Sequence, residues 1–358
     1  MSLLSDVDNP NSNYNNSGFI LPDFGFKIGN SCNGLICLTK IQICNQSLIW
    51  NPIIREFVIL PKPTTATTDR NVIMGFGYCK RTDRYKVVRI FRKLIDYCHK
   101  KRAEIYELGV GLQWREIGDV PFNIPSSNRG FFFNNSIHWL LLECSNNNNN
   151  KNNKIDNFDL IGGFDFVEEI FITISPPPIF KSDKMNEYYW SNLGVIGNRF
   201  SICATDAVRF RPDIQVWVME QYGKSDSWSI RYSIRDPFKD WCNPYKWIQV
   251  INYLKDRKIY MMCSHGYVVA YNAIDRKYVD YTKELTFDSI AHVPSLISLK
   301  DILNQRNGTG SLEMMVNCGG VDKFSVYFMC SYQYDGRMEI KSKLTSSSEL
   351  GFIINCQQ

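Results

Sequence analysis

The sequence has few histidines, no Cys-x-x-Cys pair and no long apolar stretch. Its four histidines are scattered, and none stands with cysteines at the spacing that a zinc site requires. No segment approaches the roughly 18 apolar residues of a membrane-spanning helix. The twelve cysteines lie mostly inside apolar runs, which predicts buried, reduced thiols. We therefore expect no metal, no cofactor, no membrane contact and a reducing compartment, the cytoplasm, with the nucleus as the alternative.

Long basic runs and a secretory leader are also lacking. The formal net charge is +5, from 41 basic and 36 acidic residues, and no stripe of Lys and Arg gathers it, so we expect no nucleic-acid partner. The densest basic patch, residues 99–102, is interpreted as a solvated loop between strands. Residues 1–27 begin with a stretch rich in Asn, Ser and Asp, without a basic start and an apolar core, and are expected to be disordered.

Helical periodicity is almost absent, and short apolar stretches followed by turn signals recur instead. Examples are "YKVVRI" (85–90), "AEIYEL" (103–108), "IQVWVM" (214–219) and "KIYMMC" (258–263). Aromatic residues make up 14% of the chain, a composition that favours pleated, half-buried strands. Residues 293–305 form the one segment with the pattern of a short helix. The expected fold class is therefore all-β.

Five strand-like stretches carry a central aromatic residue at nearly constant spacing, with intervals of 56, 58, 53 and 54 residues. The residues are Trp50, Tyr106, Phe164, Trp217 and Tyr271. A period near 50 with about four strands per unit is typical of a β-propeller blade, because a twisted sheet buries both faces by stacking on its neighbours. We predict a kelch-like β-propeller of about five to six four-stranded blades, with an irregular pair of β-sandwiches as the alternative.

Polar turns divide the chain further. Tight turns join the strand pairs "SCNGLICL", "FFFNNSIHWL", "VIGNRFSIC" and "YMMCSHGYVV". The Asn-rich tract 145–154 separates two strand-like segments and is interpreted as a long loop. Residues 324–344 are expected to form a hairpin around Tyr-Asp-Gly-Arg, which would complete another blade or close the ring. The predicted domains are a disordered segment 1–27 without an F-box, a propeller-like domain 28–305 and a C-terminal β-hairpin extension 306–358.

Seven successive blocks resemble a known family. They are "SCNGLICL", "IWNPIIREFVILP", "GFGYCKRTDRYKVVRI", "AEIYELGVGLQWREIGDVP", "FFFNNSIHWLL", "FDFVEEIFITI" and "IQVWVMEQYGKSDSWSIRYSI". Their order and spacing are similar to those of the plant F-box-associated domain, from about residue 28 to about residue 300. Within that family, "VPSLISL" (293–299) is similar to S-locus F-box proteins.

The resemblance implies a non-enzymatic module that binds a target protein for ubiquitination, as the substrate-recognition part of an SCF-type ubiquitin ligase subunit. The implied target is a stylar ribonuclease if the protein is of the S-locus type. Residues 1–27 contain no sequence similar to an F-box, so a Skp-type adaptor and a cullin are expected as partners where the full gene product carries one. A remnant or competitor that holds targets without ligase assembly is the alternative.

No constellation of titratable residues indicates catalysis. His138, in the alternating strand "SIHWLLL", is interpreted as a core or turn histidine with a satisfied ring nitrogen. Glu168 and Glu169 are interpreted as solvated turn residues, since sequence neighbours on a strand do not face one cleft. A kelch-type carbohydrate-active or oxidase propeller is a remote alternative. The recurrent tryptophans are expected to stack between blades; they are Trp114, Trp139, Trp217 and Trp228.

Recognition by loops is the remaining mode of action. Residues 234–247, "IRDPFKDWCNPYKW", join two predicted strands and hold charges, prolines and tryptophans. Loops on rigid scaffolds carry specificity, and Trp and Arg are common interface anchors, so we predict that this segment binds the partner. The predicted contacts are Arg235, Lys239, Asp240 and Trp241. The alternative is that Trp241 and Trp247 belong to an inner strand.

The repeat predicts a contrast in stability. Replacing Trp217 by Ala is expected to lower the free energy of unfolding by about 3–5 kcal/mol, because a large buried aromatic ring is lost. Deleting residues 146–153 is expected to change it far less, because loop length enters the closure entropy logarithmically. Thermal melts of both variants check this. A large loss of stability from the deletion, with little loss from the Trp217 variant, would show that both the core and the loop have been assigned to the wrong residues.

Overall fold

The structure is a computed structural model that consists almost entirely of β-strands. Among the described residues, no helix is long and apolar enough to span a membrane. The prediction of disorder before residue 28 falls mostly outside these residues. The described residues are 26–40, 47–63, 65, 72–95, 98–110, 113–125, 128–141, 161–178, 188–206, 214–234, 248–253, 258–263, 267–282, 287–293, 295–304, 314–316, 325–330, 341–343 and 351–354.

The first three sheets follow one another along the chain. The first contains β1 (Phe26–Cys32), β2 (Leu35–Lys40), β3 (Ser47–Asn51), β4 (Glu56–Ile59) and, at its outer edge, β22 (Met314–Val316). The second contains β5 (Ile73–Cys79), β6 (Arg84–Ile95), β7 (Cys98–Glu107) and β8 (Arg115–Asp119). The third contains β9 (Phe131–Phe133), β10 (Ser136–Leu140), β11 (Ile161–Asp165) and β12 (Ile170–Ile174).

The other three sheets complete the set within the described part of the chain. The fourth contains β13 (Tyr188–Ile196), β14 (Arg199–Asp206), β15 (Ile214–Met219) and β16 (Trp228–Ile234). The fifth contains β17 (Ile248–Tyr253), β18 (Lys258–Cys263), β19 (Tyr267–Asn272) and β20 (Lys277–Thr282). The sixth contains, in spatial order, β21 (Phe287–His292), β23 (Ser325–Cys330), β25 (Gly351–Ile354) and β24 (Lys341–Lys343).

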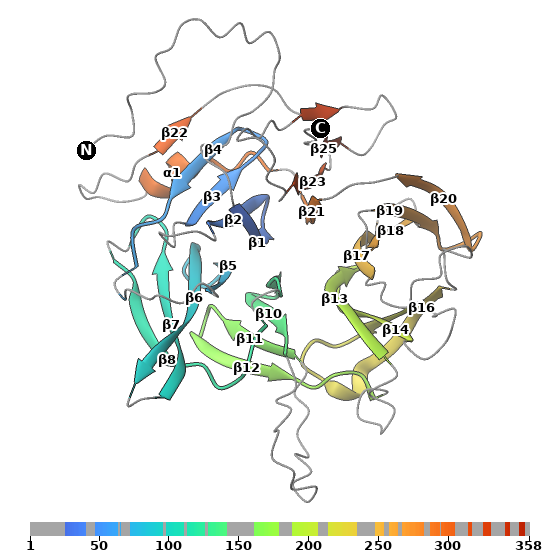
Figure 1. The fold of residues 1–358 in the computed structure, drawn as a ribbon, viewed down its shortest axis with the longest axis horizontal. Coiled ribbons are helices and arrows are strands. Elements are labelled where there is room, and N and C mark those ends of the chain that lie inside the picture. The colour runs from blue at the N-terminus through green and yellow to red at the C-terminus, as the bar shows by residue number, and fades with distance from the viewer. Residues whose placement is uncertain are drawn as a thin grey trace, which may run out of the picture.

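The six sheets close into a ring through their first strands. β1 contacts β5, β5 contacts β9, β9 contacts β13, β13 contacts β17, β17 contacts β21, and β21 contacts β1. Each of these strands lies at one edge of its sheet, so the other strands extend outward from the axis (Figure 1). The fold is therefore a β-propeller of six described blades, which confirms the predicted fold class.

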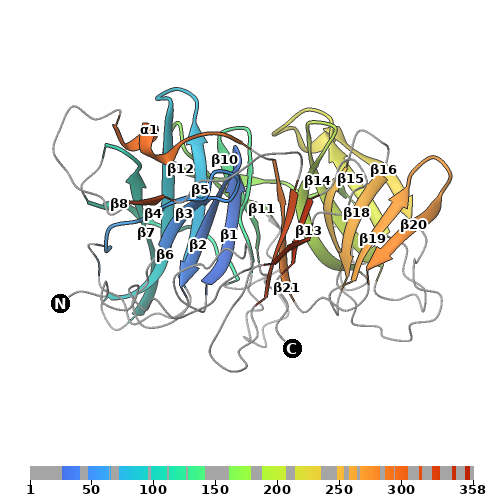
Figure 2. The same ribbon diagram turned by 90° about the horizontal axis from the view of Figure 1, so that it is seen from above.

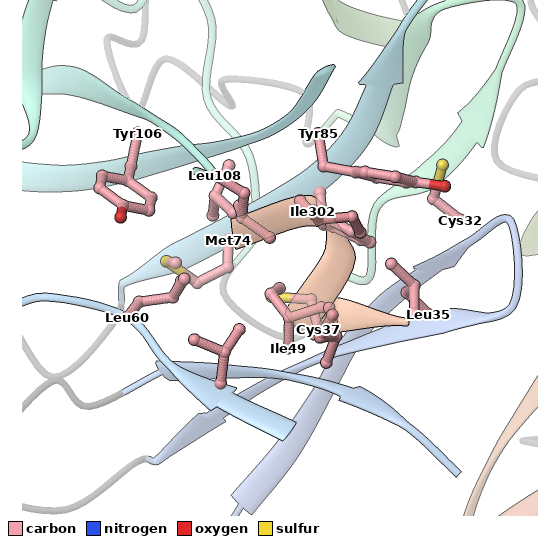
Figure 3. Packing of buried hydrophobic residues seen from close by; sticks show 14 of the residues in the cluster. Cys32, Leu35, Cys37, Ile49, Leu60, Met74, Tyr85, Tyr106, Leu108 and Ile302 are labelled. Carbon is pink, nitrogen blue, oxygen red and sulfur yellow. The ribbon is translucent and has the colours of Figure 1, made fainter. Parts of the chain in front are cut away.

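The core lies between the blades rather than inside one of them. Residues of β3 and β7 pack in one cluster between the first two blades (Figure 3), and those of β15 and β18 pack between the fourth and fifth. The sheets of the first four blades thus bury both faces against their neighbours. The five repeated aromatic residues lie on the third strands and are all buried, with Trp217 the most exposed at 9%. The prediction of equivalent, buried positions is confirmed.

The recurrent tryptophans are also buried, and two of them repeat one contact. The Nε1 of Trp114 donates a hydrogen bond to the carbonyl oxygen of Pro61 at 2.8 Å. The Nε1 of Trp228 donates to the carbonyl oxygen of Ser175 at 2.9 Å. In both cases a tryptophan at the fourth strand reaches the residues that follow the fourth strand of the preceding blade. These rings therefore join blades, as expected for structural residues.

Buried thiols accompany these apolar contacts. Four of the described cysteines are free and buried, and burial raises the pKa of the Cys37 thiol to about 12. Thiols with such pKa values are poor nucleophiles at neutral pH. Those four cysteines are Cys32, Cys37, Cys79 and Cys203.

Two kinds of turn explain the repeated sequence pattern. The first and second strands are joined in three blades by two residues that both have positive φ, the geometry of a type I′ turn. These pairs are Asn33-Gly34, Asn134-Asn135 and Gly197-Asn198. The fourth predicted pair, "YMMCSHGYVV", differs, because it supplies the second and third strands of its blade, β18 and β19.

The turn after the third strand repeats as well. In "IWNP", "GFDF" and "AYNA", an Asx side chain ends the strand and its Oδ1 accepts a hydrogen bond from the backbone N–H two residues on. The residue that precedes the fourth strand then has positive φ, between 52° and 58°. These residues are Arg55, Glu169 and Arg276. An aromatic residue followed by an Asx turn is thus the local structure behind the repeat.

The chain closes the ring by crossing between the sixth and first blades. After β21 it crosses to the first two blades and forms α1 (Leu299–Asn304), a shorter helix than predicted. It then adds β22 to β4 in antiparallel register and returns to supply β23 to β25 of the sixth blade. The prediction of a hairpin over 324–344 is wrong, because β25 lies between β23 and β24 and pairs with β23 in parallel.

Polar side chains of the first blade fix the crossing segment. The Nδ2 of Asn51 donates to the carbonyl oxygens of Ser295 (3.0 Å) and Ile297 (2.8 Å). The buried carboxylate of Glu56 accepts hydrogen bonds from Ser298 Oγ (3.0 Å) and from the backbone N–H of Leu299 (2.7 Å). A carboxylate at this position also suits the first turn of α1.

Close backbone approach adds a steric requirement at the same place. A Cβ atom on Gly34 would lie 2.3 Å from the Cβ of Ser295, and this glycine has φ +80°. On the other face of α1, the buried side chain of Ile302 enters the cluster between the first two blades (Figure 3). The crossing segment is therefore held by hydrogen bonds, shape and apolar burial together.

Replacing Glu56 by Ala is expected to lower the free energy of unfolding by about 1–3 kcal/mol, because the buried N–H of Leu299 loses its acceptor. Urea unfolding of the variant measures the loss. Glu116→Ala is the control, since Glu116 lies on an exposed part of β8. Equal stability of the Glu56 variant and the control would show that this carboxylate does not secure the ring.

Candidate partner-binding surface

The two ends of the ring carry different connections. At one end, called the turn end, the first strand turns into the second and the third into the fourth. At the other, the connection end, the second strand is joined to the third and each blade to the next. α1 lies at the turn end (Figure 2), where a Cβ on Gly109 would lie 2.4 Å from the carbonyl oxygen of Ile302. The turn end is thus partly covered by the protein's own chain.

The predicted partner-binding residues lie outside the described residues. Arg235, Lys239, Asp240 and Trp241 belong to the connection between β16, which ends at Ile234, and β17, which begins at Ile248. Because these strands belong to the fourth and fifth blades, the connection joins two blades and leaves from the connection end. The Asn-rich tract likewise falls between two paired strands, β10 and β11. The assignment of these four residues to binding stays a prediction.

His138 is a core residue, as predicted. Its Nδ1 lies 3.2 Å from the carbonyl oxygen of Phe131, and its Nε2 lies 2.7 Å from the hydroxyl of Tyr222. Burial lowers the pKa of this histidine to about 4 and raises that of Tyr222 to about 12. Both groups are therefore neutral near pH 7, and they join the third blade to the fourth. Among the described residues, no three His, Cys, Asp or Glu side chains gather as metal ligands.

Glu169 corrects one sequence prediction. It is not a solvated turn residue, because its Oε1 accepts a hydrogen bond from the buried Nζ of Lys86 at 2.7 Å and its Oε2 contacts Arg115. Partial burial alone would raise the pKa of this carboxyl, but the hydrogen bonds from Lys86 and Arg115 outweigh it and hold the pKa below its ordinary value. Glu168 is solvated as predicted and pairs with Arg81 across the surface. Glu169 thus ties the third blade to the second.

The basic patch at residues 99–102 is not a loop. β6 and β7 pair without interruption from Lys86↔Glu107 to Ile95↔Cys98, so the patch lies in a strand. β5 accompanies β6 as far as Ile90, and β8 accompanies β7 as far as Arg102. Residues 91–95 and 98–102 therefore form a two-stranded ladder that extends the sheet at the connection end; these residues are called the basic hairpin below.

Cationic residues dominate the basic hairpin. Its two strands contain five Lys and Arg residues and no acid, Asp96 lies in the sequence between them, and the whole chain has a net charge of only +5. Arg92 lies opposite Lys101, and Lys93 lies opposite Lys100. Sequence composition alone suggested a solvated loop, because it does not show which charges face one another across a ladder.

Arg102 and Lys101 bind groups on β8 and on the segment that follows it. Arg102 binds the carboxylates of Glu116 and Asp119 on β8, each at 2.6 Å. The Nζ of Lys101 donates to Asn123 Oδ1 at 2.5 Å and to the carbonyl oxygen of Ile124 at 3.0 Å. Lys93 and Lys100, by contrast, meet no carboxylate within 4.0 Å among the described residues. Leu94, which follows Lys93 on β6 and pairs with His99, is 61% exposed.

Replacing Glu169 by Gln is expected to lower the free energy of unfolding at pH 7 by about 1–3 kcal/mol, because hydrogen bonds to a charged group are lost. Since the folded-state pKa of Glu169 lies below the ordinary value of 4.5, its stabilisation is present above pH 4.5 and is lost as the pH falls through the lower value. Urea unfolding at pH 7 and pH 3 checks this. Glu168→Gln is the matched control, with little change at either pH; equal behaviour of the two variants would contradict the assignment.

Comparisons with solved structures find a beta-propeller domain and a glycosidase, both at low identity. The Cps50 (Swd1) beta-propeller domain of Myceliophteria thermophila is 9% identical, with a TM-score of 0.41 over 76% of this chain and 90% of that one. The GH32 beta-fructofuranosidase BmSUC1 of Bombyx mori is 12% identical, with a TM-score of 0.39 over 77% of this chain and 67% of that one.

Comparisons with curated sequences find plant relatives. One F-box protein of Arabidopsis thaliana is 25% identical over 232 residues, which are 58% of this chain and 51% of that protein. The F-box protein CPR1 of the same plant is 25% identical over 254 residues, 65% of this chain and 57% of that protein. The chain spans about half the length of the curated relatives it matches.

A family model defines the relationship. The model of the F-box associated beta propeller domain matches residues 9–299, a range that includes five complete blades and the first strand of the sixth. This match covers most of the chain, and the six-bladed ring has the architecture that the family description names. The chain therefore belongs to the F-box associated beta propeller family.

Proposed function

We propose that this chain captures a target protein for ubiquitination, as the substrate-recognition part of an SCF-type ubiquitin ligase. The observation that carries the proposal is the family match over residues 9–299, supported by relatives that are named F-box proteins. A ring whose blades are packed on both faces is a rigid scaffold, and rigid scaffolds favour binding through the connections that they hold in place. Non-enzymatic capture agrees with the neutral, buried state of His138.

The proposed binding surface is the connection end. Arg235, Lys239, Asp240 and Trp241 are its proposed contacts from the connection between the fourth and fifth blades. The turn end is the less suitable surface, because the crossing segment already covers part of it. A Skp-type adaptor and a cullin are further proposed partners where the full gene product carries an F-box. Cytoplasm, with the nucleus as the alternative, is the proposed location.

A finer form of the proposal is a pollen S-locus role, with a stylar ribonuclease as the target. Its support is the similarity of residues 293–299, "VPSLISL", to S-locus proteins. The same residues have a structural role, since Ser295, Ile297 and Leu299 take part in ring closure. The finer form therefore has weaker support than the general one, and direct binding to purified ribonuclease tests it.

Fusing an F-box to the full chain and expressing the fusion in plant cells is expected to enrich ubiquitinated proteins, compared with the same F-box on an unrelated propeller. Quantitative mass spectrometry measures the enrichment. Replacing Arg235 and Lys239 by Ala is expected to reduce capture several-fold with an unchanged melting temperature, because charges at an interface rim act on association rather than folding. Absence of any enriched, ubiquitinated protein with the wild-type fusion would contradict the ligase proposal.

A further inference from the structure

We infer that the basic hairpin, residues 91–95 and 98–102, docks an acidic, extended segment of the captured protein. The inference rests on the proposed function, since it names the chemistry of the partner at the connection end. It is carried by the charge pattern across β6 and β7 and by the way this hairpin extends past its sheet.

The charge pattern opposes folding. Lys93 and Lys100 face each other directly, and Arg92 and Lys101 do so one residue further in. Side chains directly opposite in an antiparallel pair have Cβ atoms about 4.5–5.5 Å apart, and like charges at that separation destabilise the ladder. Two successive like-charged pairs therefore weaken this hairpin, and within the protein Lys93 and Lys100 gain no described carboxylate in exchange.

A buried ion pair lies on the same face of the same two strands. Arg89 and Glu104 lie opposite each other four residues further in, and they form a buried ion pair with Nη1 and Oε1 2.5 Å apart. The guanidinium of Arg89 also lies 4.5 Å from the ring centre of Phe91. Opposite charges thus face each other where the ladder is buried, and like charges face each other where it projects. A function outside the fold accounts for the second arrangement.

An acidic polypeptide segment fits this surface best. Alternate side chains of an extended chain project about 6.5–7 Å apart on one side, so successive carboxylates can reach Lys93 and Lys100 or their neighbours. Beyond Ile90 on β6, and between Cys98 and Lys100 on β7, the projecting hairpin has no neighbouring strand among the described residues, and such edges accept an added strand. The exposed side chain of Leu94 offers an apolar contact, which a peptide with an apolar residue between its acids would use.

Charge variants separate docking from stability. Lys93→Glu places opposite charges across the ladder, so it is expected to raise the melting temperature and yet weaken docking. The double variant Lys93→Glu/Lys100→Glu restores a like-charged pair, so its melting temperature is expected to return toward wild type while docking weakens further. The control Lys224→Glu/Lys277→Glu makes the same change in net charge on exposed residues of the fourth and fifth blades.

The binding assay uses a defined probe and the full chain. The probe is a fluorescein-labelled dodecapeptide of alternating glutamate and threonine with one central leucine, and anisotropy is measured at 50 and 150 mM salt. Wild type and the control double variant are expected to bind alike, whereas the hairpin double variant is expected to bind about tenfold more weakly. Salt is expected to weaken binding, since the contacts are exposed. The same peptide with glutamine in place of glutamate is expected not to bind.

Several results would overturn the inference. These are equal binding of the peptide by the hairpin and control variants, no binding by wild type, and tighter binding of a 12-nucleotide RNA or of phosphatidylserine vesicles through the same lysines. In plant cells, unchanged capture of a ubiquitinated partner by the hairpin variant would refute the docking surface and leave the proposed function standing. Hairpin-dependent peptide binding without any ubiquitinated partner would support the docking surface and refute the proposed function.

Discussion

The ring depends on the attachment of the crossing segment to the first blade. Neighbouring blades share no backbone ladder, so a propeller needs some covalent or polar link between its last and first sheets to stay closed. Here Asn51 and Glu56, at the two ends of the turn between β3 and β4, bind the backbone of residues 295–299. The chain then adds β22 to the outer edge of the first sheet before it returns to the sixth. The ring is thus closed by a segment that adds a strand to the first sheet and returns to the sixth, and two side chains hold this segment in place.

Similar polar contacts link other blades in the described part of the ring. Asn30 on β1 acts as a substitute peptide group, because its Oδ1 accepts from the N–H of Phe76 (2.8 Å) and its Nδ2 donates to the carbonyl oxygen of Phe76 (2.7 Å). Lys86 and Glu169 join the second and third blades, and His138 and Tyr222 join the third and fourth. Apolar packing between sheets is non-directional, whereas these contacts set how each sheet is oriented against the next.

Much of this architecture could be predicted from the sequence, because its determinants are local. "IQVWVM" and "KIYMMC" are strands with the expected bounds, β15 and β18, and the repeated aromatic residues lie on the third strands. What could not be predicted depends on partners distant in sequence. Glu169 resembles a solvated residue until Lys86, 83 residues away, is placed beside it. The C-terminal hairpin was a reasonable local interpretation, but β25 inserts between its expected strands.

The candidate surface was predicted less completely, for a related physical reason. Polar and charged composition suggested a loop at residues 99–102, yet long strands tolerate charge when both of their faces reach solvent. The role of the charged residues depends on the register of β6 and β7, because this register places Lys93 opposite Lys100 and Arg89 opposite Glu104. The predicted contacts near Trp241 lie outside the described residues, and their role in binding is still a prediction from the composition of the loop.

The crossing of the chain between the sixth and first blades has a consequence for biosynthesis. A nascent chain that has emerged as far as residue 299, where the family match ends, holds four complete sheets, four of the five strands of the first sheet and a solitary β21. At that point β4 has an unpaired outer edge, β21 has no neighbouring strand in its own sheet, and such edges invite pairing with other chains. β4 is covered only after residues 314–316 have emerged, and β21 only after residues 325–330 have emerged. The protein is therefore most exposed to chaperones, and to misassembly, while the segment between β21 and β23 is being synthesised.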